Sequence, residues 1–245
     1  MRKILNFMVL AVLLPALLTA TVLLTYLHFF APGDKNLSGR WTASLDMTDQ
    51  AAVTAIGWLQ DIEGIDIEGI SASMQEMENT VQDFTVEVTI TFEETARSEG
   101  TFEACVIPES YETCKQAAYE VFAAMFREAV SKRLHMAGYD GSTDQEAVEA
   151  LVVETFGMST VSYLMTSVPM LLPSLEELQA QYDGSGTYQA AEGILIRQFD
   201  GRGAAAKVEH YIRKDASLIL TEEENAAPQG YFGRQYPVIY TLQTE

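Results

Sequence analysis

An uncharged hydrophobic segment at the start of this chain constrains its fold more than any other feature. Residues 4–31 contain no Asp, Glu, Lys or Arg, and Arg2 and Lys3 precede them. At about 1.5 Å per residue, a helix of this length reaches about 42 Å, more than the roughly 30 Å hydrocarbon core of a bilayer. Basic residues stay on the cytoplasmic side, so we expect residues 1–32 to be a single-pass membrane anchor with a cytoplasmic N-terminus. Residues 33–245 would then form an extracytoplasmic domain.

A cleaved signal peptide is the alternative explanation of the same segment. Leu18 and Ala20 offer a cleavage site after a shorter apolar region. Cleavage after Ala20 would leave the apolar residues 21–31 at the start of the mature protein, in contact with water. We therefore favour the uncleaved anchor in the cell membrane.

The charge balance of the chain excludes one class of partner. Fifteen Lys and Arg face 35 Asp and Glu, which gives a formal net charge of -20 and a pI near 4.4. Such an acidic surface repels phosphate groups, so we do not expect nucleic acid as a partner. Solubility, cationic peptides and metal ions remain as explanations of the excess of carboxylates.

Much of the exported part alternates between apolar and polar residues, as half-buried strands do. The same pattern, interrupted by short turns, predicts strands at residues 39–47, 84–92, 102–106, 186–189, 194–199, 205–213, 217–221 and 235–243. About eight strands close a small barrel around side chains or around one small ligand. We therefore expect an α+β fold with an antiparallel β-barrel or curved sheet of about eight strands.

Two helical insertions interrupt this series of strands, at about residues 49–82 and 109–182. In the second insertion, Ser110 can cap a helix whose apolar stripe runs to a stop at Gly138. Capping boxes at Thr143 with Glu146 and at Ser174 with Glu177 predict two further helix starts.

An uncharged stretch at residues 155–175 has three possible explanations. It could form a helix that is buried on all sides. It could form a lid over the mouth of the barrel or dip into the nearby membrane surface. It could also span the membrane, although Pro169 and Pro173 would break such a helix and its flanks are acidic.

The exported part contains two cysteines, Cys105 and Cys114. In an oxidising exterior they could close a local disulfide, or they could remain two separate thiols. A metal site would need more ligands than this pair provides.

A tandem repeat of Asp-Ile-Glu-Gly-Ile places four carboxylates close together. They are Asp61, Glu63, Asp66 and Glu68. Calcium prefers such oxygen ligands, but the spacing differs from that of an EF-hand loop. A solvated connector and a weak calcium site are the two interpretations, and we expect no other cofactor.

No catalytic or cofactor motif indicates an enzyme. The chain lacks a Gly-x-Ser-x-Gly, a His-Glu-x-x-His, a P-loop and a dinucleotide fingerprint. His210 alternates with Val208 and Ile212, which predicts that it faces the inside of the barrel. His135 lies near the end of a predicted helix, where a cation favours the helix dipole. We therefore expect a protein that is not an enzyme.

Gly39-Arg40-Trp41, at the start of the first predicted strand, resembles the Gly-x-Trp that opens the first barrel strand of lipocalins. The later strands resemble those of lipocalin-like domains anchored on bacterial surfaces. The resemblance covers roughly half the chain, and the two helical insertions depart from it. It implies an up-and-down barrel that holds a small apolar ligand.

These observations lead to two expectations of function. The first is a membrane-anchored binding module for a small apolar or amphipathic ligand, with the candidate ligand-binding residues Trp41, Phe92, Met125, Met158, Met165, His210 and Tyr240. The second is a cell-envelope protein that interacts with or assembles other proteins and whose core is filled.

Overall fold

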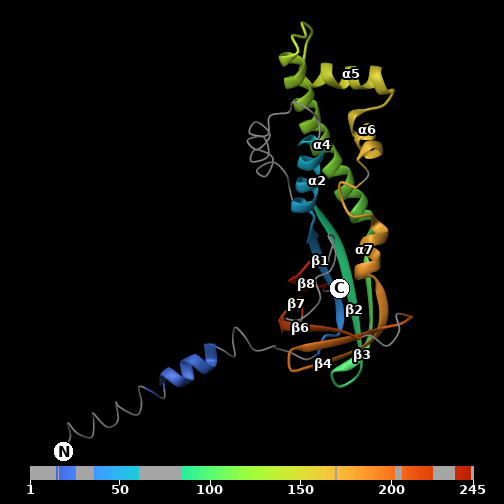
Figure 1. The fold of residues 1–245 in the computed structure, drawn as a ribbon. Coiled ribbons are helices and arrows are strands. Elements are labelled where there is room, and N and C mark those ends of the chain that lie inside the picture. The colour runs from blue at the N-terminus through green and yellow to red at the C-terminus, as the bar shows by residue number, and fades with distance from the viewer. Residues whose placement is uncertain are drawn as a thin grey trace, which may run out of the picture.

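The computed structural model describes residues 15, 17–25, 36–60, 84–168, 170–201, 206–222 and 235–243. Its centre is a closed barrel in which each antiparallel strand pairs with the next, and β8 pairs with β1 (Figure 1). The strands are β1 (Gly39–Asp46), β2 (Thr85–Ala96), β3 (Glu99–Val106), β4 (Gly184–Ala191), β5 (Ile194–Phe199), β6 (Ala206–Lys214), β7 (Ser217–Glu222) and β8 (Val238–Leu242). The expected α+β fold and its number of strands are therefore confirmed. Of the two expected forms of the sheet, the closed barrel is the one that forms.

Strand β2 shows how the alternating sequence sets which residues face the inside of the barrel. Val86 and Ile90 are fully buried, whereas Glu87 and Glu93 are exposed. Ile90 pairs with Trp41 of β1, so the large apolar residues of neighbouring strands meet on the inner face. A slip of one residue would turn all of them to the solvent, and this sets the register.

Both helical insertions leave the barrel at the same end, which we call the cap end. The helix α2 (Thr48–Gln60) follows β1, and the helices α4 (Pro108–Met136), α5 (Gln145–Phe156), α6 (Thr160–Ser167) and α7 (Leu175–Tyr182) lie between β3 and β4. We call these helices the helical cap, which extends away from the barrel along α4 (Figure 1). The opposite end, the turn end, holds three short strand-to-strand turns and the point where the chain enters β1.

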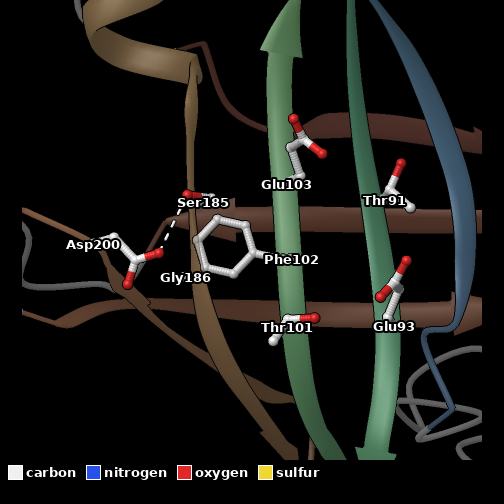
Figure 2. A pocket seen from close by; sticks show the side chains of 8 residues that line it. All are labelled: Thr91, Glu93, Thr101, Phe102, Glu103, Ser185, Gly186 and Asp200. Atoms are coloured by element: carbon white, nitrogen blue, oxygen red, sulfur yellow. Dashed lines mark hydrogen bonds between the residues drawn. The ribbon is translucent and has the colours of Figure 1, made fainter.

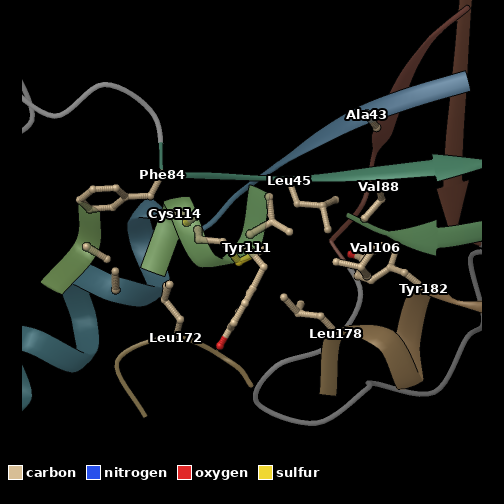
Figure 3. Packing of buried hydrophobic residues seen from close by; sticks show 14 of the residues in the cluster. Ala43, Leu45, Phe84, Val88, Val106, Tyr111, Cys114, Leu172, Leu178 and Tyr182 are labelled. Carbon is tan, nitrogen blue, oxygen red and sulfur yellow. The ribbon is translucent and has the colours of Figure 1, made fainter. Parts of the chain in front are cut away.

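The barrel and the helical cap share one continuous core. At their junction, Leu45 and Val106 of the barrel lie near Tyr111 of α4 and Leu178 of α7 (Figure 3). The Tyr111 hydroxyl also donates a hydrogen bond of 3.0 Å to the carbonyl of Pro173, just before α7. We therefore expect the first turns of α4 and the whole of α7 to be held rigidly on the barrel.

One of the three predicted helix starts is confirmed in full. Ser174 caps α7 by accepting from the Glu177 amide, and the Glu177 side chain accepts from the Ser174 amide. At α5 the prediction is wrong by one residue, because Asp144 rather than Thr143 accepts from the first turn of the helix. The Thr143 hydroxyl instead forms a hydrogen bond of 2.7 Å with His135 Nε2 at the end of α4.

Helix α4 begins without the side-chain cap that the sequence predicted. Its N-cap residue is Ile107, and Pro108 occupies the first turn, where a missing N–H does no harm. The Ser110 hydroxyl donates to the Ile107 carbonyl and accepts from the Glu87 amide of β2. Ser110 therefore joins α4 to the barrel. The helix ends at Met136, two residues before Gly138, close to the predicted stop.

The uncharged stretch does not form a single helix. Helix α5 ends at Phe156, and α6 covers only eight residues of the stretch. Leu164, Leu171 and Leu172 are buried, but Phe156 and Met158 are exposed, so the interpretation as a helix buried on all sides is wrong. The short α6 leaves one side in the core and the other at the surface.

The predicted membrane anchor lies largely outside the described residues. Of residues 1–32, the structure describes 15 and 17–25, which are helical and exposed. Within the described parts of the chain, no helix is both long enough and apolar enough to cross a membrane.

Candidate functional site

The inside of the barrel is occupied by large side chains. Trp41, Phe92 and Tyr240, three of the predicted ligand-binding residues, all lie there and are at most 4 % exposed. The ring of Phe92 lies 4.9 Å from the ring of Tyr188, in an edge-on arrangement that favours aromatic pairs. The structure thus brings these predicted residues together, and side chains of the protein itself surround them.

A buried ion pair completes the interior, and sequence analysis missed it. Arg197 of β5 and Glu209 of β6 are 1 % and 0 % exposed, and Arg197 Nε donates to Glu209 Oε2 at 2.8 Å. The Tyr236 hydroxyl donates to the other carboxylate oxygen of Glu209 at 2.6 Å. The guanidinium carbon of Arg197 also lies 5.3 Å and 5.4 Å from the ring centres of Phe102 and Phe199. Because charges are costly to bury, removing one member of this ion pair would destabilise the barrel.

The prediction that His210 faces the inside of the barrel is wrong. His210 is exposed on the outer face of β6, and its neighbours Glu209 and Tyr211 point inward. Val208 and Ile212, which share the side of His210, are half-buried on that outer face. The strand therefore buries its more polar side.

The three methionines predicted to cover a ligand belong to the helical cap and not to the barrel. Met125 is buried in α4, at about 25 Å along the helix from its first residue. Met165 is half-buried on α6, and Met158 is 39 % exposed before it. The predicted set of ligand-binding residues is thus divided between two regions of the molecule.

The Gly39-Arg40-Trp41 motif packs against residues of other strands at the turn end of the barrel. A Cβ on Gly39 would lie 2.7 Å from Leu242 Cδ1, and the φ of +123° at this position also favours glycine. The Trp41 indole donates to the Leu37 carbonyl at 2.8 Å. The Arg213 guanidinium carbon lies 5.5 Å from the centre of the Trp41 ring, and Arg213 also donates to the carbonyl of Asn36.

The two cysteines are free in the structure, so the predicted disulfide alternative is not formed. Cys105 lies on the outer face of β3, where its sulfur is 3.1 Å from the Thr89 hydroxyl. Cys114 is buried at the base of α4, and burial, with a smaller contribution from Asp46, raises its pKa to about 11. Such a thiol is a weak nucleophile at neutral pH.

The predicted calcium ligands Asp61, Glu63, Asp66 and Glu68 lie outside the described residues. Within the described residues, no group of three or more His, Cys, Asp or Glu side chains is arranged to hold a metal ion.

A hollow of about 260 Å³ lies on the outside of the barrel, over β2, β3 and β4. Figure 2 shows Glu93, Glu103 and Asp200 around it, with the Phe102 ring and Gly186 between them. The Ser185 hydroxyl donates to Asp200 at 3.2 Å across its edge. The hollow opens to solvent and has three carboxylates in its lining, so it differs from the apolar pocket inside the barrel that the sequence predicted.

The helical cap exposes an apolar corner where α5 turns into α6. Val153, Phe156 and Met158 are 45 %, 46 % and 39 % exposed. The Phe156 ring is stacked on the ring of Tyr163 with 4.3 Å between centres. We call these four residues the α5–α6 corner. Large aromatic and methionine side chains at one exposed place are typical of protein-contact surfaces.

No protein-family model, curated protein or solved structure matches this chain. The resemblance to lipocalins therefore depends on the closed eight-stranded barrel and on the residues at its turn end.

Proposed function

We propose that this chain is a membrane-anchored interaction module of the cell envelope, which binds a partner protein through the α5–α6 corner. The observation that carries the proposal is the exposure of Val153, Phe156 and Met158 on a helical projection that leaves the barrel at its cap end. The N-terminal segment joins the barrel at the opposite, turn end. An anchor in that segment would hold the turn end toward the membrane and direct the helical cap away from it.

The large side chains that the described strands place inside the barrel support a role for it as a rigid support. Side chains such as Trp41, Tyr188 and the paired Arg197 and Glu209 occupy the space where a lipocalin-like domain would hold its ligand. A small apolar ligand would have to displace these side chains and separate a buried ion pair, which costs several kcal/mol. The geometry therefore favours the interaction module over the small-ligand carrier.

The helices of the helical cap are arranged so that they hold the α5–α6 corner in a defined position. Helix α4 has 29 residues, which is about 43 Å of helix. Arg127 of α4 donates to Glu149 of α5 at 2.9 Å, and the amide and hydroxyl of Thr160 donate to the same carboxylate at 3.0 Å and 2.6 Å. This carboxylate fixes α5 and α6 on α4, so the α5–α6 corner has a defined shape.

The charges around the corner indicate the chemistry of the partner. Helix α5 carries Glu146, Glu149 and Glu154 and has no basic residue. Glu146 and Glu154 are exposed. The complementary surface is an apolar groove flanked by Lys or Arg, since opposite charges at the rim steer association and aromatic side chains at the centre supply affinity.

Site-specific photo-crosslinking in intact cells tests this function. With p-benzoylphenylalanine at Met158 of the full chain, we expect an adduct with one other protein that mass spectrometry can identify. Adding Phe156→Asp should reduce the yield of this adduct about tenfold, because a charge would enter the apolar contact. The matched control places the photo-crosslinker at Ser44, which is exposed on β1. Equal adduct formation at Met158 and Ser44, or an adduct that survives Phe156→Asp, would refute the proposal.

Protease added to intact cells tests the placement separately. We expect the domain after residue 36 to be degraded without lysis of the cells. Degradation only after lysis would place the domain on the other side of the membrane and remove the envelope role.

A further inference from the structure

The connection between α5 and α6 consists of three residues, and one of them has an apolar side chain. Gly157 ends α5 in the left-handed conformation, with a φ of 72°, and has no side chain. Ser159 caps α6 by accepting from the Ser162 amide at 3.2 Å. Met158 lies between these two caps and is 39 % exposed. A change in the chemistry of the Met158 side chain therefore acts directly where α6 begins.

Met158 occupies the position before the N-cap of α6. An apolar residue at this position commonly packs on the residue four positions after the N-cap and fixes the angle at which the chain enters the helix. In α6 that residue is Tyr163, whose ring is stacked on Phe156 and lies 6.1 Å from the ring of Phe126 in α4. A thioether sulfur also makes favourable contacts with aromatic rings. The apolar character of Met158 therefore favours the present arrangement of α6 on α4.

Two other methionines of the helical cap are more exposed than Met158 but lie elsewhere. Met136 is 68 % exposed at the last residue of α4, and Met170 is 57 % exposed after the end of α6. Neither of them stands next to an N-cap residue. Both meet the same solvent as Met158, so they provide controls that separate exposure from position.

We propose that Met158 is an oxidation-sensitive position, at which a hydroperoxide weakens the contact surface of the α5–α6 corner. The Met158 sulfur attacks the terminal oxygen of the hydroperoxide, so that a sulfur–oxygen bond forms and the oxygen–oxygen bond breaks. The sulfur loses two electrons, the hydroperoxide is reduced to an alcohol or to water, and the proton of the attacked oxygen passes to the leaving oxygen. The product is methionine sulfoxide, whose side chain is polar.

The sulfoxide changes both the start of α6 and the surface of the corner. A polar side chain before Ser159 packs less well on an aromatic ring, so α6 is held less firmly at its first turn. The new oxygen also enters the apolar surface that Met158 forms with Val153 and Phe156, where a partner would have to bury it without a hydrogen-bond donor. The effect on the partner rests on the proposed function, whereas the effect on α6 does not.

Hydrogen exchange of the purified full chain in detergent tests the effect on α6. We expect hydrogen peroxide to lower the protection factors of α6 about fivefold in the unmodified chain. Met158→Leu keeps an apolar side chain without a thioether, so its protection factors in α6 should be the same before and after peroxide. Met170→Leu is the matched control and should respond to peroxide as the unmodified chain does. The proposal is overturned if peroxide leaves Met158 unoxidised, if its sulfoxide leaves the protection factors unchanged, or if Met158→Leu responds equally.

Photo-crosslinking in intact cells tests the effect on the partner. With p-benzoylphenylalanine at Val153, hydrogen peroxide should reduce the adduct yield about tenfold in the unmodified chain and in Met170→Leu, but leave the yield of Met158→Leu at its own untreated level. The same reduction in all three chains would show that Met158 does not control the contact. Absence of any adduct before peroxide would refute the proposed function instead, and the exchange measurement would still decide the role of Met158.

Discussion

The barrel and the helical cap of this chain are stabilised in different ways. The barrel is a closed sheet whose interior contains aromatic rings and the fully buried pair of Arg197 and Glu209. The distal part of the helical cap depends on interactions that are more exposed, with the Glu149 carboxylate at their centre. A closed sheet has no edges to adjust, whereas packed helices can shift and repack their surface side chains. This difference accords with the proposal that the barrel is the support and the α5–α6 corner the contact surface.

The largest predicted effect is that of losing the buried ion pair. Glu209→Ala should lower the free energy of unfolding by about 3–5 kcal/mol, because the Arg197 charge would remain buried without its partner. The equivalent change in the helical cap is Glu128→Ala, which removes an exposed pair with Lys132 and should cost about 0.5 kcal/mol or less. Chemical denaturation of both variants measures the difference. Equal effects would mean that the barrel interior does not dominate the stability.

Glycine-to-alanine substitutions should have opposite effects on stability in the barrel and in the helical cap. A Cβ at Gly100 of β3 would lie 1.9 Å from the Glu93 carbonyl oxygen, so Gly100→Ala should destabilise the barrel by about 1–3 kcal/mol. A Cβ at Gly57 of α2 has no atom within 4 Å, and Gly57→Ala should stabilise the helical cap by about 0.5–1 kcal/mol. Thermal melting of both variants checks the prediction. A destabilising Gly57→Ala would contradict the open surroundings of α2.

The last prediction concerns the pH dependence of the helical cap. Partial burial raises the pKa of the Glu149 carboxyl, but hydrogen bonds from Thr160 and Arg127 outweigh it and hold the pKa below its ordinary value. A lowered pKa in the folded state means that Glu149 stabilises the cap above the ordinary pKa of Glu, and that this contribution is lost as the pH falls through the folded value. The side chain is 32 % exposed, so we expect only about 1 kcal/mol.

Protection factors for hydrogen exchange in α5 and α6, calculated against the intrinsic exchange rates at neutral and at acidic pH, measure this effect. Glu149→Gln should lower these protection factors at neutral pH and leave little further change in them on acidification. The control is Glu154→Gln on the exposed face of the same helix, which should behave like the unmodified chain. Protection factors that do not change with pH in the unmodified chain would show that Glu149 does not hold the α5–α6 corner in place.

The strand positions could be predicted because most strands alternate in the expected sense. Residues 194–199 were predicted as a strand, and β5 covers the same residues. The sequence was a poorer guide to which side of a strand faces the inside of the barrel. In β6 the apolar Val208 and Ile212 face outward and the charged Glu209 faces inward, so a rule that apolar residues are buried selected the wrong side and with it His210.

The α5–α6 corner could not be predicted as a surface. The uncharged sequence around Phe156 and Met158 indicated burial, because an uncharged stretch is normally removed from water. Which of its residues become buried depends on how α6 lies against α4, and that is set by the bonds of Glu149 with Arg127 and Thr160. No local pattern in the sequence reveals these long-range partners.

The sequence by itself determined the strong acidity, the number of strands and the places of the helical insertions, because charge, alternation and turn residues are local properties of the chain. Only the tertiary structure decided that the barrel closes, that Arg197 and Glu209 meet inside it and that Met158 remains exposed between α5 and α6. The physical reason is that burial is a property of the whole fold: a side chain leaves water only when distant segments cover it.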